Sequence, residues 1–162
     1  MLNRRLFLIA AALGAVATRL GLGSGPAVAA GKFPVIHTDE EWHKLLTSDQ
    51  YDVLRGEGTE YPFSSALLHE ERKGNFACAG CQQDVFSSSA KFDSGTGWPS
   101  FWAPIADAVG TTEDHSFGMA RTAVHCSRCG GHLGHVFPDG PKPTGLRYCI
   151  NGVAMTFHPV SA

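Results

Sequence analysis

Five cysteines are the residues best suited to chemistry in this chain, and four of them fall in two CxxC pairs. Cys78 and Cys81 form "CAGC", and Cys126 and Cys129 form "CSRC". Two such pairs can place four thiolates tetrahedrally around one structural Zn(II) ion. The 44 residues between the pairs (82–125) far exceed the spacing of a compact zinc ribbon. The metal is therefore expected to join distant strands of a larger fold, with disulfides or a redox-active pair as the alternatives.

The fifth cysteine, Cys149, stands alone in "LRYCIN". If this stretch is a strand, side-chain alternation places Arg147, Cys149 and Asn151 on one face and their apolar neighbours on the other. A nearby positive charge favours the thiolate, the nucleophilic form, so Arg147 is expected to lower the pKa of the thiol. The alternatives are a buried cysteine that serves as a small core residue and an arginine that pairs with a surface carboxylate.

Two histidines, His132 and His135, follow a Gly-Gly turn in "CGGHLGHVF". Imidazole titrates near neutral pH, so a histidine close to Cys149 can deliver a proton to a departing oxygen. Strict strand alternation puts the two on opposite faces, so either one lies on the turn or only one serves the site. As an alternative, the pair is structural or binds a metal. The stretch "GWPSFW", which contains Trp98, has the composition of an apolar pocket wall or of core packing.

The elements that must position these residues are two short helices followed by many strands. Thr38 or the residue after it is expected to cap the first helix, in which Trp42, Leu45 and Leu46 recur at helical spacing. A second helix over residues 47–54 ends before a pair of glycines. The rest of the chain alternates short apolar stretches with Gly, Pro and Ser, which predicts a mostly β domain with many turns.

The first 30 residues have the features of an export signal. They hold Arg4 and Arg5, an apolar run from Leu6 to Ala17 and small residues before a cleavage site, without any acid. The run is shorter than a membrane-spanning helix, so cleavage is expected, with a retained anchor as the alternative. The adjacent arginines resemble the twin-arginine signal, which predicts export of folded protein to the bacterial periplasm by the twin-arginine machinery.

Cleavage would leave one domain, residues 31–162, with an acidic balance. Three arginines and no acid are removed, so 10 basic side chains face 15 acidic ones and the net charge is -5. Such a surface gives nucleic acid no electrostatic reason to bind. Nothing in the sequence demands more than a monomer.

Taken in order, "CAGC", "KFDSGTGWPSFW", "CSRCGGHLGHVF", "DGP" and "TGLRYCIN" resemble the MsrB family of peptide methionine (R)-S-oxide reductases. The resemblance implies a mainly β (α+β) fold of two small antiparallel sheets with N-terminal helices. It also implies that methionine (R)-S-oxide in peptides or proteins is reduced through a sulfenic acid on Cys149. By the same resemblance, the active site contains Cys149, His132, His135 and Asn151, while Trp98 and Phe137 hold the substrate methyl group and Cys78, Cys81, Cys126 and Cys129 bind one structural zinc ion.

This chain departs from the family pattern at two positions. Many relatives carry a recycling cysteine in the stretch matching "SGTGWPSF", where this chain has Thr96. With the other four cysteines committed to zinc, no intramolecular disulfide step is expected, and a small thiol or a thioredoxin-like partner must reduce the sulfenic acid. Relatives also often carry an acid at the position of Ala123 in "RTAV", so that position cannot tune the site here.

Two other functions fit parts of the pattern. A zinc-stabilised binding module would use "GWPSFW" as a groove for a partner, and it would not need Cys149. A different Cys/His enzyme, such as a thiol hydrolase or a peroxidase, would use the same nucleophile on another substrate. Replacing Cys149 by serine would leave the first function intact, and an acyl-enzyme formed from an ester would reveal a hydrolase.

Overall fold

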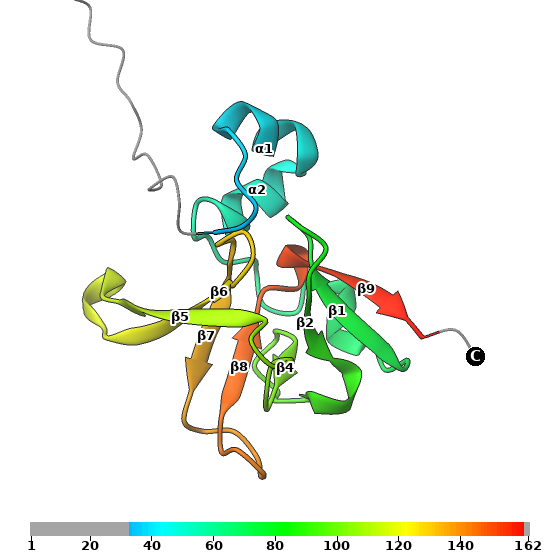
Figure 1. Cartoon of the computed structure of the whole chain (residues 1–162). Coiled ribbons are helices and arrows are strands. Elements are labelled where there is room, and N and C mark those ends of the chain that lie inside the picture. Colours follow the sequence, from blue (N-terminus) through cyan, green and yellow to red (C-terminus); the bar gives the residue numbers. More distant parts are fainter. Residues whose placement is uncertain (1–32, 161–162) are drawn as a thin grey trace, which may run out of the picture.

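The computed structural model describes residues 33–160, in which two helices precede two antiparallel sheets (Figure 1). The expected mainly β fold with N-terminal helices is confirmed. The helices are α1 (Asp39–Leu45) and α2 (Ser48–Leu54). The strands are β1 (Gly74–Cys78), β2 (Asp84–Ser87), β3 (Lys91–Phe92), β4 (Ser100–Phe101), β5 (Val109–Asp114), β6 (Arg121–Cys126), β7 (His132–Phe137), β8 (Arg147–Ile150) and β9 (Met155–Pro159), with single 3-10 turns η1 (Ala66–His69), η2 (Ser88–Ala90), η3 (Ser116–Gly118) and η4 (Gly152–Ala154) between them.

Both α-helices begin with a capping box. The Thr38 hydroxyl accepts a hydrogen bond from the Glu41 backbone N–H, and the Glu41 carboxylate accepts one from the Thr38 N–H. Thr47 and Gln50 repeat the arrangement at the start of α2. These contacts satisfy backbone donors that have no partner inside a helix, so the starts of both short helices follow from local sequence.

The apolar face of α1 is narrower than the sequence predicts. Trp42 and Leu46 are buried, but Leu45, expected on the same face, is 58% exposed. The helix ends at Leu45, and Leu46 takes an extended backbone conformation at the C-cap that turns its side chain inward. Val53 and Leu54 of α2 join the same core.

The six-stranded sheet has the order β3-β4-β8-β7-β6-β5, and the three-stranded sheet has the order β2-β1-β9. Every pairing is antiparallel. β8 is an interior strand, hydrogen-bonded to β4 on one side and to β7 on the other. A residue on β8 is therefore held from both sides, which is the rigid support that a chemically active side chain needs.

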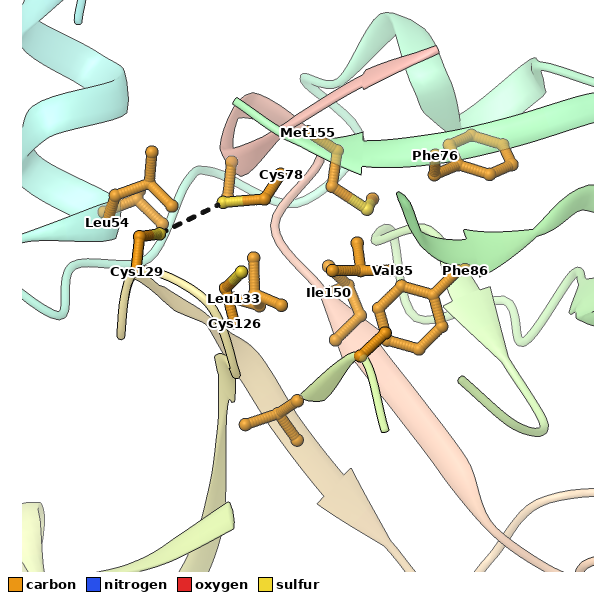
Figure 2. Close-up of a cluster of buried hydrophobic side chains, with 14 of the residues drawn as sticks. Leu54, Phe76, Cys78, Val85, Phe86, Cys126, Cys129, Leu133, Ile150 and Met155 are labelled. Atoms are coloured by element: carbon orange, nitrogen blue, oxygen red, sulfur yellow. Dashed lines mark hydrogen bonds between the residues drawn. The ribbon is translucent and has the colours of Figure 1, made fainter. Parts of the chain in front are cut away.

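Aromatic side chains fill the space between the two sheets (Figure 2). Phe86 stacks on Phe101 at 4.4 Å between ring centroids, and Phe76 meets Phe101 edge-on at 5.0 Å. These three rings and Ile150 of β8 are fully buried, and each contributes about 1.5–3 kcal/mol by leaving water. Trp102 packs against this core, so one of the two tryptophans in "GWPSFW" serves packing, as expected.

Within residues 33–160, no helix is long and apolar enough to span a membrane. The expected export signal, residues 1–30, lies outside the described part of the chain, so it stays a prediction.

Candidate active site and zinc centre

Four cysteine thiols converge where the two sheets approach the helices. Cys78 ends β1 and Cys81 lies in the turn after it, while Cys126 ends β6 and Cys129 lies in the next turn. Their Sγ atoms all lie within 4.8 Å of one another, with 3.7 Å between Cys78 and Cys129 and 3.5 Å between Cys81 and Cys126. Figure 2 shows Cys78, Cys126 and Cys129 together, close to Leu54 of α2. The cluster joins strands of different sheets, as the long spacing predicts.

This geometry fits zinc and does not fit disulfides. Zn–S bonds of about 2.3 Å in a tetrahedron give S–S edges of about 3.8 Å, close to the shorter separations here. A disulfide would bring two sulfurs to about 2 Å, and all four cysteines are free thiols. Three of the four are buried, where several thiolates cannot be ionised together without a cation. The four cysteines form the structural site for one zinc ion.

Cys149 occupies an interior position of the large sheet. It lies opposite His135 of β7 and opposite Ser100 of β4. Strand alternation turns Ile150 into the core, where it is fully buried, and leaves half-buried Cys149 on the other face with Arg147. The two faces of this strand are those expected from "LRYCIN".

A chain of hydroxyl groups leads to the thiol of Cys149. The Oγ atoms of Ser100 and Ser94 lie 2.7 Å apart, and Ser94 Oγ lies 2.8 Å from Thr96 Oγ1. Thr96 Oγ1 in turn lies 3.8 Å from Cys149 Sγ. Thr96, the position at which the chain departs from the pattern implied by the sequence resemblance, is thus in direct contact with the thiol.

The charge of Arg147 lowers the pKa of the Cys149 thiol, as expected, but burial of the thiol raises that pKa by more. Arg147 pairs with the carboxylate of Asp139 through hydrogen bonds of 2.9 and 2.8 Å and lies 4.5 Å over the ring of Phe137. Burial raises the pKa of Cys149 above its ordinary value, and the Thr96 hydroxyl and the Arg147 charge only partly oppose this. The raised pKa favours the protonated thiol in the resting site, although the contribution of Arg147 has the direction expected from the sequence.

A β-bulge brings the two predicted histidines together. β7 follows β6 in regular register as far as Gly134, and the pairing then skips Leu133 so that His132 has the next partner. The extra residue puts His132 and His135 on the same face, with their ring centroids 5.3 Å apart. The prediction of opposite faces assumed strict alternation, which fails at this bulge.

The two imidazoles have different surroundings. His132 is 5% exposed, its Nε2 has no hydrogen-bond partner among the described residues, and burial lowers its pKa to about 4. His132 is therefore neutral at pH 7. His135 is less buried, and its Nε2 lies 2.7 Å from a carboxylate oxygen of Asp114. This contact fixes the orientation of the His135 ring.

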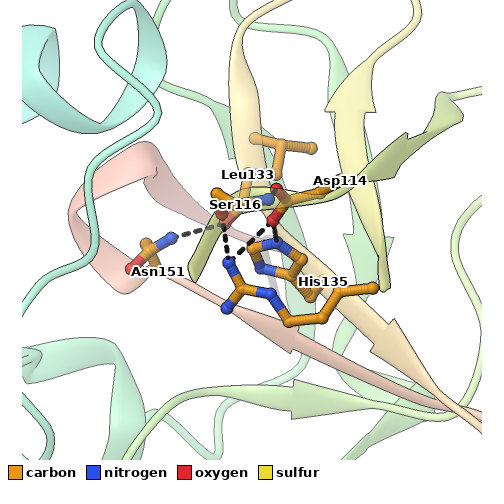
Figure 3. A network of polar contacts seen from close by, with 6 residues as sticks. Asp114, Ser116, Leu133, His135 and Asn151 are labelled. Carbon is orange, nitrogen blue, oxygen red and sulfur yellow. Dashed lines mark hydrogen bonds and ion pairs between the residues drawn. The ribbon is translucent and has the colours of Figure 1, made fainter. Parts of the chain in front are cut away.

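The carboxylate of Asp114 belongs to a polar network at the β5–β6 hairpin (Figure 3). Asp114 accepts hydrogen bonds from the Ser116 backbone N–H at 2.8 Å and from the Arg121 guanidinium at 2.7 Å. The guanidinium also donates to the Ser116 hydroxyl at 2.9 Å. Hydrogen bonds from Ser116 and the ring of His135 hold the pKa of Asp114 well below its usual range. Asp114 is therefore a fixed anion beside His135.

An acidic side chain, that of Asp114, reaches His135 from a different strand from the one that carries Ala123. Ala123 lies opposite His135 on one side and opposite Thr112 of β5 on the other. Asp114 is two residues beyond Thr112 on the same face, which lets its carboxylate reach the His135 ring. Sequence reasoning considered position 123 alone and missed Asp114, because the register of the hairpin was needed to place it.

Asn151 and Trp98, both predicted as site residues, share Glu60 as a hydrogen-bond partner. Asn151 is 3% exposed, and its amide donates to the Leu133 carbonyl at 3.0 Å and accepts from the Glu60 backbone N–H at 3.0 Å. The Trp98 indole N–H donates to the Glu60 carbonyl at 3.2 Å. The side chain of Asn151 thus binds backbone groups, whereas the sequence resemblance implies a residue of the active site.

Comparison with known proteins agrees with this arrangement. The SelR domain family matches residues 46–159. Peptide methionine sulfoxide reductase MsrB of Methanosarcina barkeri is 58% identical over 121 residues, which cover 74% of this chain and 85% of that protein. The protein of the same name from Leptospira interrogans is 52% identical over 126 residues, or 77% of this chain and 96% of that protein. The chain belongs to the MsrB family.

The family match places the site in context. Both CxxC pairs and Cys149 fall inside the matched residues of this MsrB chain, whereas α1 lies before them. The family and the fold expected from the sequence motifs are confirmed. The roles of the residues predicted for the Cys149 site stay predictions. The structure places them on β7 and β8, directly after β8 and in the loop before β4: His132, His135 and Phe137 on β7, Arg147 and Cys149 on β8, Asn151 after it and Trp98 in the loop.

Proposed function

We propose that this MsrB chain reduces methionine (R)-S-oxide in peptides or proteins to methionine, with Cys149 as the nucleophile. The observation that carries the proposal is the environment of this thiol, which has Thr96 in contact and His135 directly opposite on the neighbouring strand. The names of the similar proteins, peptide methionine sulfoxide reductases, support the substrate class. The choice of the R epimer follows from the family resemblance.

The first step is attack of the Cys149 sulfur on the electrophilic sulfur of the sulfoxide. The S–O bond of the substrate breaks, its oxygen ends on Cys149 as a sulfenic acid, and methionine leaves as the thioether. One thiol and one sulfoxide give one sulfenic acid and one thioether, so atoms balance. The cysteine sulfur loses the two electrons that the substrate sulfur gains.

Proton delivery to the sulfoxide oxygen falls to groups on the same face as Cys149. Because burial raises the pKa of Cys149, the thiol still carries its proton when substrate arrives. The thiol must lose this proton to attack, because the thiolate is the nucleophile, and a histidine on the same face can deliver a proton to the sulfoxide oxygen. Asp114 holds the His135 ring in place, and neutral His132 presents an uncommitted Nε2 beside it.

Trp98 and Phe137 supply the apolar side of the site. Both are half-buried, Trp98 is held by its indole N–H, and Phe137 lies under the Arg147 guanidinium. Aromatic rings favour contact with methyl and sulfur groups. With the methyl against the rings and the oxygen toward the histidines, one epimer presents its sulfur to Cys149 and the other does not.

Regeneration of Cys149 requires a reductant from outside the chain. The other four cysteines form the zinc site, and the residue that touches Cys149 is Thr96. Two equivalents of a small thiol, or one reduced thioredoxin-like dithiol, would convert the sulfenic acid to a thiol, with one disulfide and one water as products. A disulfide between Cys149 and a zinc cysteine during turnover would contradict this.

Single turnover tests the proposal. Purified zinc-loaded protein is mixed with R or S methionine sulfoxide in separate tubes, and methionine is counted before any reductant is added. We expect about one methionine per chain from the R epimer alone, with a sulfenic acid trapped on Cys149. Cys149→Ser should abolish the product. Methionine from neither epimer would overturn the proposal and favour a zinc-stabilised binding module, and an acyl-enzyme from an ester would favour a hydrolase.

We also propose that the chain acts on exported proteins after transport to the periplasm. The support is the basic, acid-free segment before the domain, with Arg4 and Arg5 ahead of its apolar run. Export after folding would let zinc enter in the reducing cytoplasm and protect the thiolates. Replacing both arginines by lysine should keep the protein out of the periplasm in cell fractionation. Unchanged periplasmic protein would contradict the twin-arginine route.

A further inference from the structure

Glu60, in the segment between α2 and η1, hydrogen-bonds to two predicted site residues, Asn151 and Trp98. The Glu60 backbone N–H donates to Asn151 Oδ1 at 3.0 Å, and the Glu60 carbonyl accepts from Trp98 Nε1 at 3.2 Å. Asn151 follows β8 two residues after Cys149, and Trp98 precedes β4. One residue from outside both sheets therefore binds the side chains that flank the thiol.

The Glu60 carboxylate anchors this arrangement. It accepts hydrogen bonds from the backbone N–H groups of Gly152 and Val153, the latter at 3.1 Å. These two residues begin η4, the turn that directly follows Asn151. Hydrogen bonds to an ionised carboxylate are stronger than those between neutral groups. The side chain of Glu60 thus fixes the end of β8 while its backbone fixes the indole.

Close packing leaves this segment little freedom to shift. The Phe63 backbone N–H donates to the Gly97 carbonyl at 2.7 Å. Gly97 has a φ of +94°, and a Cβ there would lie 2.8 Å from Pro62 Cβ, closer than real contacts. Residues 60–63 therefore lie directly against the loop that carries Thr96 and Trp98. A change in the position of Glu60 must therefore also shift that loop.

We propose that Glu60 is a positioning residue that holds Trp98 and Asn151 in place around Cys149. The inference rests on the proposed function, because it assigns Trp98 to the wall that receives the substrate methyl group. Removing the carboxylate frees residues 60–63 from η4, so the indole loses its fixed acceptor and the end of β8 loosens. A misplacement of about 1 Å at such a site can cost about 100-fold in rate.

The test compares Glu60→Ala and Glu60→Gln with Glu41→Ala. Glu41 is a carboxylate with a capping role in α1, so its loss reports what a stability change alone does to activity. For each zinc-loaded protein we would measure thermal unfolding, KM for a peptide R-sulfoxide, the single-turnover rate per folded molecule and tryptophan emission. Glu60→Gln keeps the shape but places an amide NH2 group against one backbone N–H donor.

We expect Glu60→Ala to lower the single-turnover rate by about 10- to 100-fold and to raise KM, because the displaced wall affects both binding and chemistry. Glu60→Gln should lower the rate and raise KM by smaller factors, and Glu41→Ala should have the rate and KM of the parent chain. Tryptophan emission should shift to the red in Glu60→Ala. The shift should be absent when Glu60→Ala is placed in a Trp98→Phe background, and the two effects on rate should be non-additive.

Two results would separate failure of this inference from failure of the proposed function. If the parent chain forms no methionine from either epimer, the proposed function is wrong. If the parent chain is active while Glu60→Gln has parental rate, KM and emission, Glu60 has only a structural role and the inference is overturned. This holds even if Glu60→Ala does not fold.

Discussion

Replacing Thr96 by cysteine should change the end point of a turnover from a sulfenic acid to a disulfide. Thr96 Oγ1 lies 3.8 Å from Cys149 Sγ, and a disulfide brings its two sulfur atoms to about 2 Å, so the two side chains must approach each other by about 2 Å. The movement falls on the Gly95 side of the loop, where even an added Cβ would meet no atom within 4 Å, because Gly97 is held against Pro62 and Phe63. A thiol at position 96 would then attack the sulfenic acid and release water.

The stabilisation expected from the new disulfide follows from the length of the loop that it closes. Residues 96 and 149 are 53 positions apart, and closing a loop of that length removes about 4 kcal/mol of chain entropy from the unfolded state at 25 °C. For a domain of this size that corresponds to an increase in Tm of roughly 10–20 °C as an upper bound. Strain in the folded state would reduce the gain.

The assay combines mass spectrometry with calorimetry. Zinc-loaded Thr96→Cys protein receives one equivalent of R-sulfoxide without reductant, and its mass and Tm are measured before and after dithiothreitol. We expect loss of the mass of two hydrogens and a raised Tm, both reversed by reduction. Thr96→Ser is the control and should stop at a sulfenic acid with unchanged Tm. A trapped sulfenic acid on Cys149 in Thr96→Cys, beside a second free thiol, would refute the contact on which the prediction rests.

Three further changes test the electrostatics and the metal centre. Arg147→Met removes a charge that lowers the pKa of Cys149, so the single-turnover rate should rise only at higher pH, with about a tenfold loss of rate at pH 7 for each unit by which that pKa rises. Arg147→Lys should retain most of the rate. An unchanged pH profile in Arg147→Met would contradict the role of the charge. His132 has a folded-state pKa of about 4 against about 6.5 when unfolded, so its contribution to stability is lost as pH falls from 6.5 to 4. His132→Asn should therefore remove up to about 3 kcal/mol of acid sensitivity in urea unfolding, and equal sensitivity in both proteins would show that burial does not keep His132 neutral. Cys126→Ser should release zinc and lower the Tm, whereas full zinc content with parental Tm would exclude Cys126 as a ligand.

The parts of the structure that sequence predicts are those fixed by local chemistry. Thr38 and Thr47 cap their helices because the residue three positions later completes each capping box. The cysteine pairs indicate zinc because a CxxC turn presents two thiols to one ion wherever it lies. Alternation around Cys149 holds because β8 is a regular strand within the sheet. None of these inferences needs knowledge of which strands are neighbours.

The parts that sequence does not predict depend on the register of paired strands and on how deeply a side chain is buried. Leu133 is an ordinary apolar residue in the sequence, and only its missing partner on β6 reveals the bulge that aligns the two histidines. Asp114 reaches His135 from another strand, and Glu60 reaches Asn151 from 91 residues away. The pKa of Cys149 likewise depends on how deeply the sheet buries it. Charge spacing along the chain carries no information on that depth.

The zinc cluster also has a consequence for the order in which the chain is assembled. After Cys81 has been synthesised and before Cys126 has, only two of the four ligands exist, and a long loop must still close before the others can bind. Of the two partners of β1 in the small sheet, β2 follows it directly but β9 comes later still, because Gly74 pairs with Pro159. Neither the metal centre nor the small sheet can be completed during most of translation. A nascent chain of this protein must therefore keep Cys78 and Cys81 reduced and free of a disulfide until Cys126 and Cys129 have also left the ribosome.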